Sequence, residues 1–214
     1  MSTKVTNIVL LVVIVISFGA GVGLYPSLPD QMASHWNAAG AVDDYMGKFW
    51  GTFLLPTIML MMLVLYFIIP KIDPLGKNIG DFRKYYNLFW VFLFLFMAYV
   101  FKLTILWNLG WQFDFTLLLM PALAVLWFCL GVFLKRAKRN WFVGIRTPWT
   151  LSSDLVWDKT HQVGGRLFQV TAPIILISIW FQDKLFYFLF IPVMATILFC
   201  VIYSYILYWR ENKS

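Results

Sequence analysis

The side chains best suited to chemistry gather in residues 140–165, NWFVGIRTPWTLSSDLVWDKTHQVGG. Arg146 could bind a phosphate or a carboxylate through two hydrogen bonds, or it could pair with Asp154 and fasten the segment. His161 follows Asp158 by three residues, so the two side chains could meet on a helix. A carboxylate partner favours the imidazolium, which would suit a proton or anion contact, and the alternative is a plain surface ion pair.

The local sequence predicts how this segment folds. Thr147 precedes a proline and is biased toward extended backbone, so GIRTPWT is expected to be an extended turn. A helix can follow, with Ser152 as its N-cap and Asp154 in its first turn, where the helix dipole favours a carboxylate. We expect that helix to end at Gly164 and Gly165.

The polar residues of this helix share one face, because helical spacing brings together Asp154, Trp157, Asp158 and His161. The apolar residues point elsewhere. We therefore expect a short amphipathic helix that lies against the cytoplasmic membrane face, with the tryptophans of the segment, Trp149 among them, as anchors.

A second unusual segment is LPDQMASHWNAAGAVDDYMGK, residues 28–48, in which Asp43 and Asp44 give a net negative charge. Such a loop could bind an external ligand. The alternative is a capped interfacial turn in which His35 and Asn37 hydrogen-bond the backbone.

Lys102 is the one ionisable residue expected inside a membrane span, about five residues from its outer end. Its side chain could reach the interface, as long basic side chains do. Otherwise it could pair with Asp43, Asp44 or Asp114 and link the outer loop to the helices.

Metal and enzyme chemistry find little support in the sequence. The only two histidines, His35 and His161, are expected on opposite membrane faces and cannot share an ion. We see no nucleophile with a base beside it and no phosphate-binding loop, so we expect no catalytic residues, metal or cofactor.

The elements that must position these residues are membrane helices. The chain is 61% hydrophobic and only 13% charged, about half the usual charged share. Six apolar runs are long enough to cross a bilayer: 7–25, 49–69, 87–107, 115–134, 167–181 and 185–209, the fifth beginning earlier, near Val163. The fold class is therefore all-α, a polytopic membrane protein with six spans in one bundle.

Basic residues predict the orientation. With six spans, most of the 17 basic residues fall on the side of Lys4, so both termini are predicted to be cytoplasmic. The net charge of +7 could suggest nucleic acid, but basic loop ends facing anionic lipid head groups explain it better. The expected partner is therefore the lipid bilayer and not nucleic acid.

Both unusual segments resemble a known family. The outer segment contains LP, H-x-N and G-x-x-D, and it resembles the N-terminal domain of unknown function that begins SdpI-like proteins. The inner segment contains N-x-x-x-G-I-R-T-P-W-T followed by W and H, and it is similar to the signature of the SdpI domain. The matching positions are His35, Asn37, Gly40 and Asp43, and then Asn140, Gly144, Arg146, Thr147, Pro148, Thr150, Trp157 and His161. Residue chemistry adds further candidate binding residues: Asp44, Lys102, Trp149, Asp154 and Asp158.

The resemblance implies a multi-pass protein of the bacterial plasma membrane. The stretch PKIDPLGKNIGDFRK, residues 70–84, has enough Pro, Gly and charge to divide the chain into an N-terminal hairpin domain (1–85) and a four-span SdpI-like domain (86–214). The resemblance also implies immunity to a small secreted peptide toxin met on the outer face, and a signalling role in which a cytoplasmic repressor is held at the membrane. We expect binding rather than catalysis. The alternatives are a small-molecule or peptide transporter with proline-bearing helices as hinges, and a membrane enzyme acting on a lipid head group.

Overall fold

The computed structural model describes residues 1–37, 39–181 and 184–213. Within these residues six helices are long and apolar enough to cross a membrane, as predicted. They are α1 (Thr3–Leu24), α2 (Lys48–Ile72), α4 (Arg83–Asn108), α5 (Phe115–Leu134), α7 (Asp154–Ile177) and α8 (Leu185–Glu211). The shorter elements are the 3-10 turns η1 (Tyr25–Ser27) and η2 (Ser178–Trp180), helices α3 (Gly76–Asp81) and α6 (Pro148–Ser152), and strands β1 (Gln31–Trp36) and β2 (Val42–Gly47).

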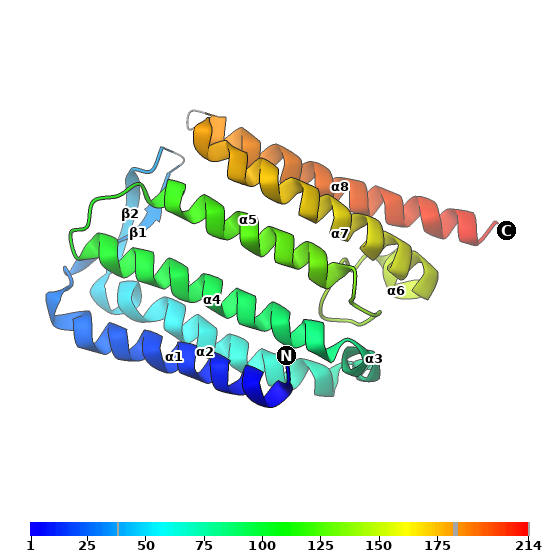
Figure 1. Ribbon diagram of the computed structural model, residues 1–214, viewed down its shortest axis with the longest axis horizontal. Helices are drawn as coiled ribbons and strands as arrows, with labels where there is room; N and C mark the ends of the chain where they lie inside the picture. The colour runs from blue at the N-terminus through cyan, green and yellow to red at the C-terminus, as the bar shows by residue number, and fades with distance from the viewer. Residues whose placement is uncertain (38, 182–183, 214) are drawn as a thin grey trace.

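The long helices form two layers, with α1, α2 and α4 in one and α5, α7 and α8 in the other (Figure 1). Helix α4 packs against α5 and joins the layers. Both termini lie at the same end of the bundle as the loop between α5 and α7, and the β1–β2 hairpin lies at the opposite end (Figure 1). We call these the loop end and the hairpin end.

Aromatic side chains fill the core of the first layer toward the loop end. The ring of Tyr86 stacks on Tyr66 with centroids 5.7 Å apart and meets Trp90 edge-on at 6.0 Å. The Tyr66 hydroxyl and the Arg83 Nε both donate to the Asn87 side-chain oxygen at 3.0 Å. Because these polar groups satisfy one another, they can be buried between apolar helices without a large desolvation cost.

Helices α5 and α7 approach closely through two glycines. A methyl group added at Gly131 would lie 2.5 Å from the carbonyl oxygen of Gly165, and one added at Gly165 would lie 2.6 Å from the carbonyl oxygen of Gly131. The prediction that Gly164 and Gly165 end a helix is therefore wrong, since α7 continues to Ile177. Within a span the lack of a side chain at these positions serves close packing of helix backbones.

The loop-end helices also differ from prediction in their start points. Thr147 is extended, as expected, and caps α6. The prediction that GIRTPWT is an extended turn is wrong from Pro148 on, because the five residues from Pro148 form a short helix. The predicted cap Ser152 is wrong, because Ser153 caps α7 by accepting from the Val156 N–H. Asp154 does lie in the first turn, but that turn already belongs to the fifth long helix. The predictions of a separate short amphipathic helix and of a fifth span that begins near Val163 are therefore wrong, because α7 is continuous from Asp154 to Ile177.

The hairpin of β1 and β2 is a feature that the sequence did not predict. The strands pair antiparallel, with Ala33 opposite Tyr45, and Gly40 has the positive φ of 75° in the turn between them. The Asn108 side chain, at the end of α4, accepts from the Ala33 N–H at 2.8 Å and donates to the Ala33 carbonyl at 3.1 Å. The amide thereby pairs with the backbone of β1 on the side away from β2.

Candidate functional site

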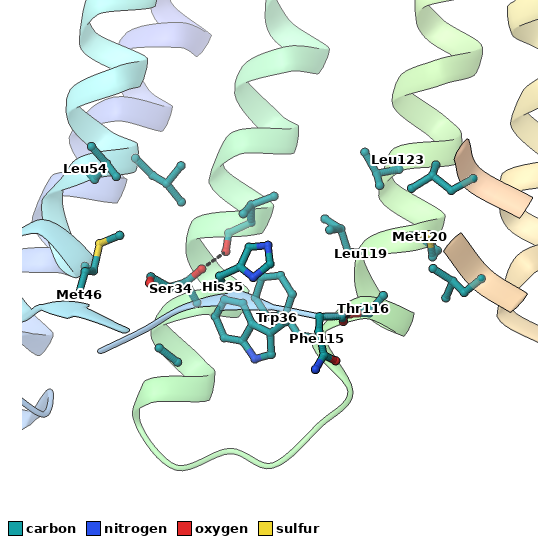
Figure 2. Close-up of a pocket in the computed structure, with 18 of the residues that line it drawn as sticks. Ser34, His35, Trp36, Met46, Leu54, Phe115, Thr116, Leu119, Met120 and Leu123 are labelled. Atoms are coloured by element: carbon teal, nitrogen blue, oxygen red, sulfur yellow. Dashed lines mark hydrogen bonds between the residues drawn. The ribbon is translucent and has the colours of Figure 1, made fainter. Parts of the chain in front are cut away.

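A cavity of about 620 Å³ lies at the hairpin end, covered by β1 and walled by α2, α4, α5 and the first turns of α8 (Figure 2). Its volume is in the range of small-ligand pockets. The deeper walls are apolar, with Leu54, Leu55, Leu119, Met120, Leu123 and Leu189. Polar side chains are fewer: Ser34, His35, Asn37, Thr104 and Thr116. This composition suits an apolar or amphipathic ligand that makes a few hydrogen bonds.

His35 and Asp43 form a pair on this hairpin. The His35 Nδ1 lies 2.5 Å from a carboxylate oxygen of Asp43, and the two side chains are 67% and 43% exposed. The expectation that His35 bonds the backbone is wrong, because β2 presents a carboxylate across the hairpin instead. The pair places a carboxylate beside a residue that lines the cavity.

Asn37 organises the turn of the hairpin. Its side-chain oxygen accepts from the N–H groups of Ala39 and Ala41, as expected for a backbone-bonding asparagine. The backbone carbonyl oxygen of Asn37 accepts from the Thr116 hydroxyl at 3.1 Å. At Gly40, an added methyl group would lie 2.6 Å from a carboxylate oxygen of Asp114, the N-cap residue of α5. The turn is therefore fastened against the start of α5.

The remaining candidates at the hairpin end lie apart from the cavity. A carboxylate oxygen of Asp44 accepts from the neighbouring Tyr45 N–H at 2.8 Å. Lys102 is exposed on α4, and among the described residues it forms no ion pair with Asp43, Asp44 or Asp114. The pairing alternative for Lys102 is therefore wrong, because those carboxylates are held by His35 and by backbone N–H groups.

At the loop end, Asn140 shapes the chain between α5 and α6. It is fully buried, its side-chain oxygen accepts from the N–H groups of Phe142 and Val143, and its amide donates to the carbonyls of Lys138 and Val143. A buried amide with both ends satisfied in this way fixes a tight loop. Asn140 is therefore a structural residue of the loop.

His161 and Trp157 form the floor under this loop. The two rings stack with centroids 3.9 Å apart, and both are buried. The His161 Nε2 accepts from the Ile145 N–H at 2.9 Å, so the proton of a neutral ring lies on Nδ1, which donates to the Trp157 carbonyl. The predicted contact of His161 with Asp158 is wrong, because both ring nitrogens already bond to backbone groups.

Gly144 completes the fit between loop and floor. Its φ of 121° is open to glycine and strained for other residues. A methyl group there would lie 2.6 Å from the His161 Nε2 and 3.1 Å from the Trp157 ring. The glycine is required both by its backbone conformation and by the ring beneath it.

The TPWT segment anchors the loop to α8. The Thr147 and Thr150 side chains cap one another's backbone N–H groups, and the Thr147 hydroxyl lies 3.0 Å from that of Ser204 on α8. Pro148 begins α6, and the ring centroids of Trp149 and Tyr205 lie 5.1 Å apart. These contacts hold α6 against the last helix.

The charged candidates of the loop end take partners that the sequence did not indicate. Arg146 donates to the Trp141 carbonyl at 2.9 Å, while Asp154 lies 2.8 Å from the Arg139 Nε. The predicted pair of Arg146 with Asp154 is therefore wrong. Asp158 lies 3.8 Å from the ammonium of Lys138. The four-residue polar face of α7 is thus split, with Trp157 and His161 buried and the two aspartates exposed.

Two segments of the chain match family models. Residues 136–204 match the SdpI/YfhL protein family, and residues 12–60 match a domain of unknown function (DUF1648). Over an alignment of 214 residues the chain is 24% identical to "Immunity protein SdpI" of Bacillus subtilis (strain 168), with 97% of this chain and 98% of that protein covered. The predicted resemblance to the SdpI family is confirmed. No solved structure matches the chain.

Each matched segment contains part of one site, and the cavity walls on α4 and α5 lie in neither segment. The DUF1648 segment includes β1 and β2, and the SdpI/YfhL segment includes the loop after α5, α6 and α7. Strand β1, which carries His35, and the start of α7, which carries His161, lie at opposite ends of the bundle, so the two histidines do not form one centre (Figure 1).

Several residues of the cavity were missed by the sequence analysis. Trp36 stacks on Phe115 with centroids 3.8 Å apart, and both line the cavity (Figure 2). Thr104 and Thr116 also line it, from α4 and α5. Within apolar spans these threonines gave no signal of a site, but Trp36 lies inside the H-x-N motif and could have been included.

At the loop end, residues outside the motif hold the loop in place. A carboxylate oxygen of the buried Asp73 accepts from the Trp141 N–H at 2.9 Å, and the Asn78 amide donates to the Arg139 carbonyl at 2.8 Å. These bonds connect the α2–α3 region to the SdpI/YfhL segment. Their only sequence signal was a polar, proline- and glycine-containing stretch between two spans.

Proposed function

We propose that this protein protects the cell that carries it against a small secreted peptide toxin, and that it does so by binding the peptide at the hairpin-end cavity. Similarity to an immunity protein along nearly the whole chain supports the role. The cavity beneath the hairpin supports the place, and it is the observation on which the proposal depends. The repressor-holding role stays a prediction.

The cavity suits part of an amphipathic peptide. Leu119, Leu123 and Met120 offer an apolar surface for aliphatic or aromatic side chains (Figure 2). The exposed Asp43 carboxylate beside His35 offers a contact for a basic side chain or a terminal amine. A ligand that combines the two features would be held by both.

The position of the cavity favours binding over the transporter alternative. Transporter sites lie near the middle of the bilayer, between helices that can open to either side. This cavity is instead covered by β1, which Asn108 fastens to α4, and Thr116 fastens the following residue, Asn37, to α5. At the loop end, the chain is tied across α2, α3, α7 and α8 by the bonds described above.

A cavity-filling variant tests the proposal. We would express the protein in toxin-sensitive cells, challenge them with a panel of small secreted peptide toxins, and compare wild type with Leu119→Trp, whose larger side chain fills the cavity. The matched control is Leu118→Trp, one position along α5, where the side chain is 40% exposed on the outside of the bundle. We expect wild type and the control to protect and Leu119→Trp to lose protection.

Two results would contradict the proposal. Equal protection by Leu119→Trp and wild type would remove the cavity from the mechanism. Failure of wild type to protect against any peptide of the panel, with the protein present in the membrane, would favour the transporter or enzyme alternatives. An Arg146→Ala variant reports separately on whether the loop end contributes.

A further inference from the structure

A second cavity lies at the loop end, away from the proposed peptide site. Its volume is about 460 Å³, and it lies between the end of α3, the start of α4 and the turn that follows α5. Three basic side chains line it, Lys135, Arg136 and Lys138, together with Asp81 and Asp158. The cavity therefore has more basic than acidic side chains.

The walls of this cavity are fixed by hydrogen bonds to the backbone. The Trp157 Nε1 donates to the Ala137 carbonyl at 2.8 Å, and the Gln162 side chain donates to the Lys135 carbonyl at 2.8 Å. Both bonds hold the turn of residues 135–138, which we call the basic turn, against α7. On the other side, the Asn78 amide ties the chain at Arg139 to α3. The basic turn is thus positioned before any ligand arrives.

The positive charges of the cavity are only partly compensated. Lys138 lies 3.8 Å from the Asp158 carboxylate, and both side chains are more than half exposed, so the pair is weak. Arg136 makes no ion pair among the described residues; its guanidinium lies 5.4 Å from the centre of the Tyr85 ring. An aromatic face holds the guanidinium in place but leaves its N–H groups available to an anion.

The depth of the cavity indicates which anion it meets. It lies where α5 ends at Leu134 and α4 begins at Arg83, which is the boundary between the apolar helices and the polar loop end. At that depth a membrane presents phosphate groups of its lipids, and basic pockets between spanning helices bind such head groups. A guanidinium can bind a phosphate through two hydrogen bonds.

We propose that this cavity binds the phosphate group of an anionic phospholipid, with Arg136 and Lys138 as its main contacts. The acyl chains would lie along the lipid-facing sides of α4 and α5, and the head group would sit between α3 and the basic turn. The bound lipid would link the two helical layers at the loop end.

The test is lipid retention by the purified full-length protein in detergent, measured by native mass spectrometry with added phosphatidylglycerol or phosphatidylcholine. We expect preferential retention of phosphatidylglycerol, and a loss of about fivefold in its affinity for each charge removed in Arg136→Gln and Lys138→Gln. The control is Lys4→Gln with Lys213→Gln, which removes the same charge at the same end outside the cavity.

Three results would overturn the proposal: unchanged phosphatidylglycerol affinity in the double variant, an equal loss in the control, or equal retention of the two lipids by wild type. A competition experiment with a water-soluble phosphate ester distinguishes a lipid phosphate from a free one. Displacement of the lipid by an equimolar amount of glycerol phosphate would overturn the lipid assignment in favour of a free phosphate ester. If the double variant unfolds, Lys138→Gln alone decides, since that side chain is 54% exposed.

Discussion

The ring of His161 lies flat on the ring of Trp157, one helical turn before it on α7, at a centroid distance of 3.9 Å and an angle of 17°. The stack supports the loop above it, because the Ile145 N–H donates to the Nε2 of His161. The Trp157 Nε1 meanwhile donates to the Ala137 carbonyl. One pair of aromatic side chains thus holds both the beginning and the middle of the long loop.

The first prediction concerns Gly144, which lies directly over this stack. We expect Gly144→Ala to reduce stability by about 2 to 4 kcal/mol, because the new methyl group meets His161 and the backbone φ becomes strained. The measurement is the thermal unfolding temperature of the purified protein in detergent. Each kcal/mol should lower it by about 2 to 4 °C for a chain of this size.

A matched control separates strain from the steric clash. Gly110 also has a positive φ, 95°, but a methyl group there has no neighbour within 4 Å among the described residues. Gly110→Ala should therefore lower the unfolding temperature less than Gly144→Ala. Equal effects of the two substitutions would mean that the contact with His161 is unimportant.

The second prediction concerns the approach of α5 to α7. Gly131→Ala should push the helices apart, because the methyl group would lie 2.5 Å from a backbone oxygen that cannot move away like a flexible side chain. Overpacking of this kind costs about 1 to 3 kcal/mol. In Gly23→Ala on α1, where no neighbour lies within 4 Å of the new methyl, the same measurement of unfolding should show no loss.

The sequence predicted the membrane bundle well, because the physics of that inference is local. Each apolar run needs only its own length to be recognised as a span, and the six helices follow from it. The boundary of the fifth span was harder. Gly164 and Gly165 looked like a helix end in isolation, and only the packing of α5 against them explains why the helix continues.

In the candidate sites too, the sequence could not predict contacts that depend on tertiary packing. The sequence identified His35, His161 and Arg146 as unusual residues, but it assigned partners by nearness along the chain. Asp158 is one turn from His161, yet the loop brings the Ile145 N–H and Lys138 to these two residues instead. Partners that arrive from a distant segment, such as Asp73 for the loop, are set by tertiary packing and have no local signature.

The hairpin was missed for a related reason. Residues 31–36 are too short and too mixed for a clear alternating pattern, and their pairing with residues 42–47 is completed by Asn108, which lies 75 positions from Ala33. A polar residue at the end of a span normally signals only the interface. Its role as a partner for a strand becomes visible when both backbone groups of Ala33 are seen to bond it.

The third prediction tests this connection. Asn108→Ala leaves the N–H and the carbonyl of the buried Ala33 without the side chain that pairs them, at a cost of about 1 to 3 kcal/mol for each group. We expect faster hydrogen exchange across residues 31–47 and a loss of protection in the toxin assay. Asn212→Ala removes an exposed bond to Tyr208 at the other end and should change neither. Unchanged exchange in the hairpin of Asn108→Ala would disprove the connection.

The fourth prediction concerns orientation, which follows from the distribution of basic residues. We expect the hairpin end to face outward and the loop end to face the cytoplasm. Single cysteines at Ala39 and Ser152, both exposed positions at opposite ends, can report this through a membrane-impermeant maleimide. Ala39→Cys should react in intact cells, and Ser152→Cys should react only after the membrane is opened.

The unmodified protein is the control for this labelling, since its two cysteines, Cys129 and Cys200, lie within α5 and α8 and should stay unlabelled in intact cells. If both introduced cysteines reacted in intact cells, the two ends could not lie on opposite sides of the bilayer, and the six-span arrangement would be wrong. If only Ser152→Cys reacted, the bundle would be inverted. The hairpin-end cavity would then face the cytoplasm, where a secreted peptide does not arrive, and the proposed function would have to be abandoned.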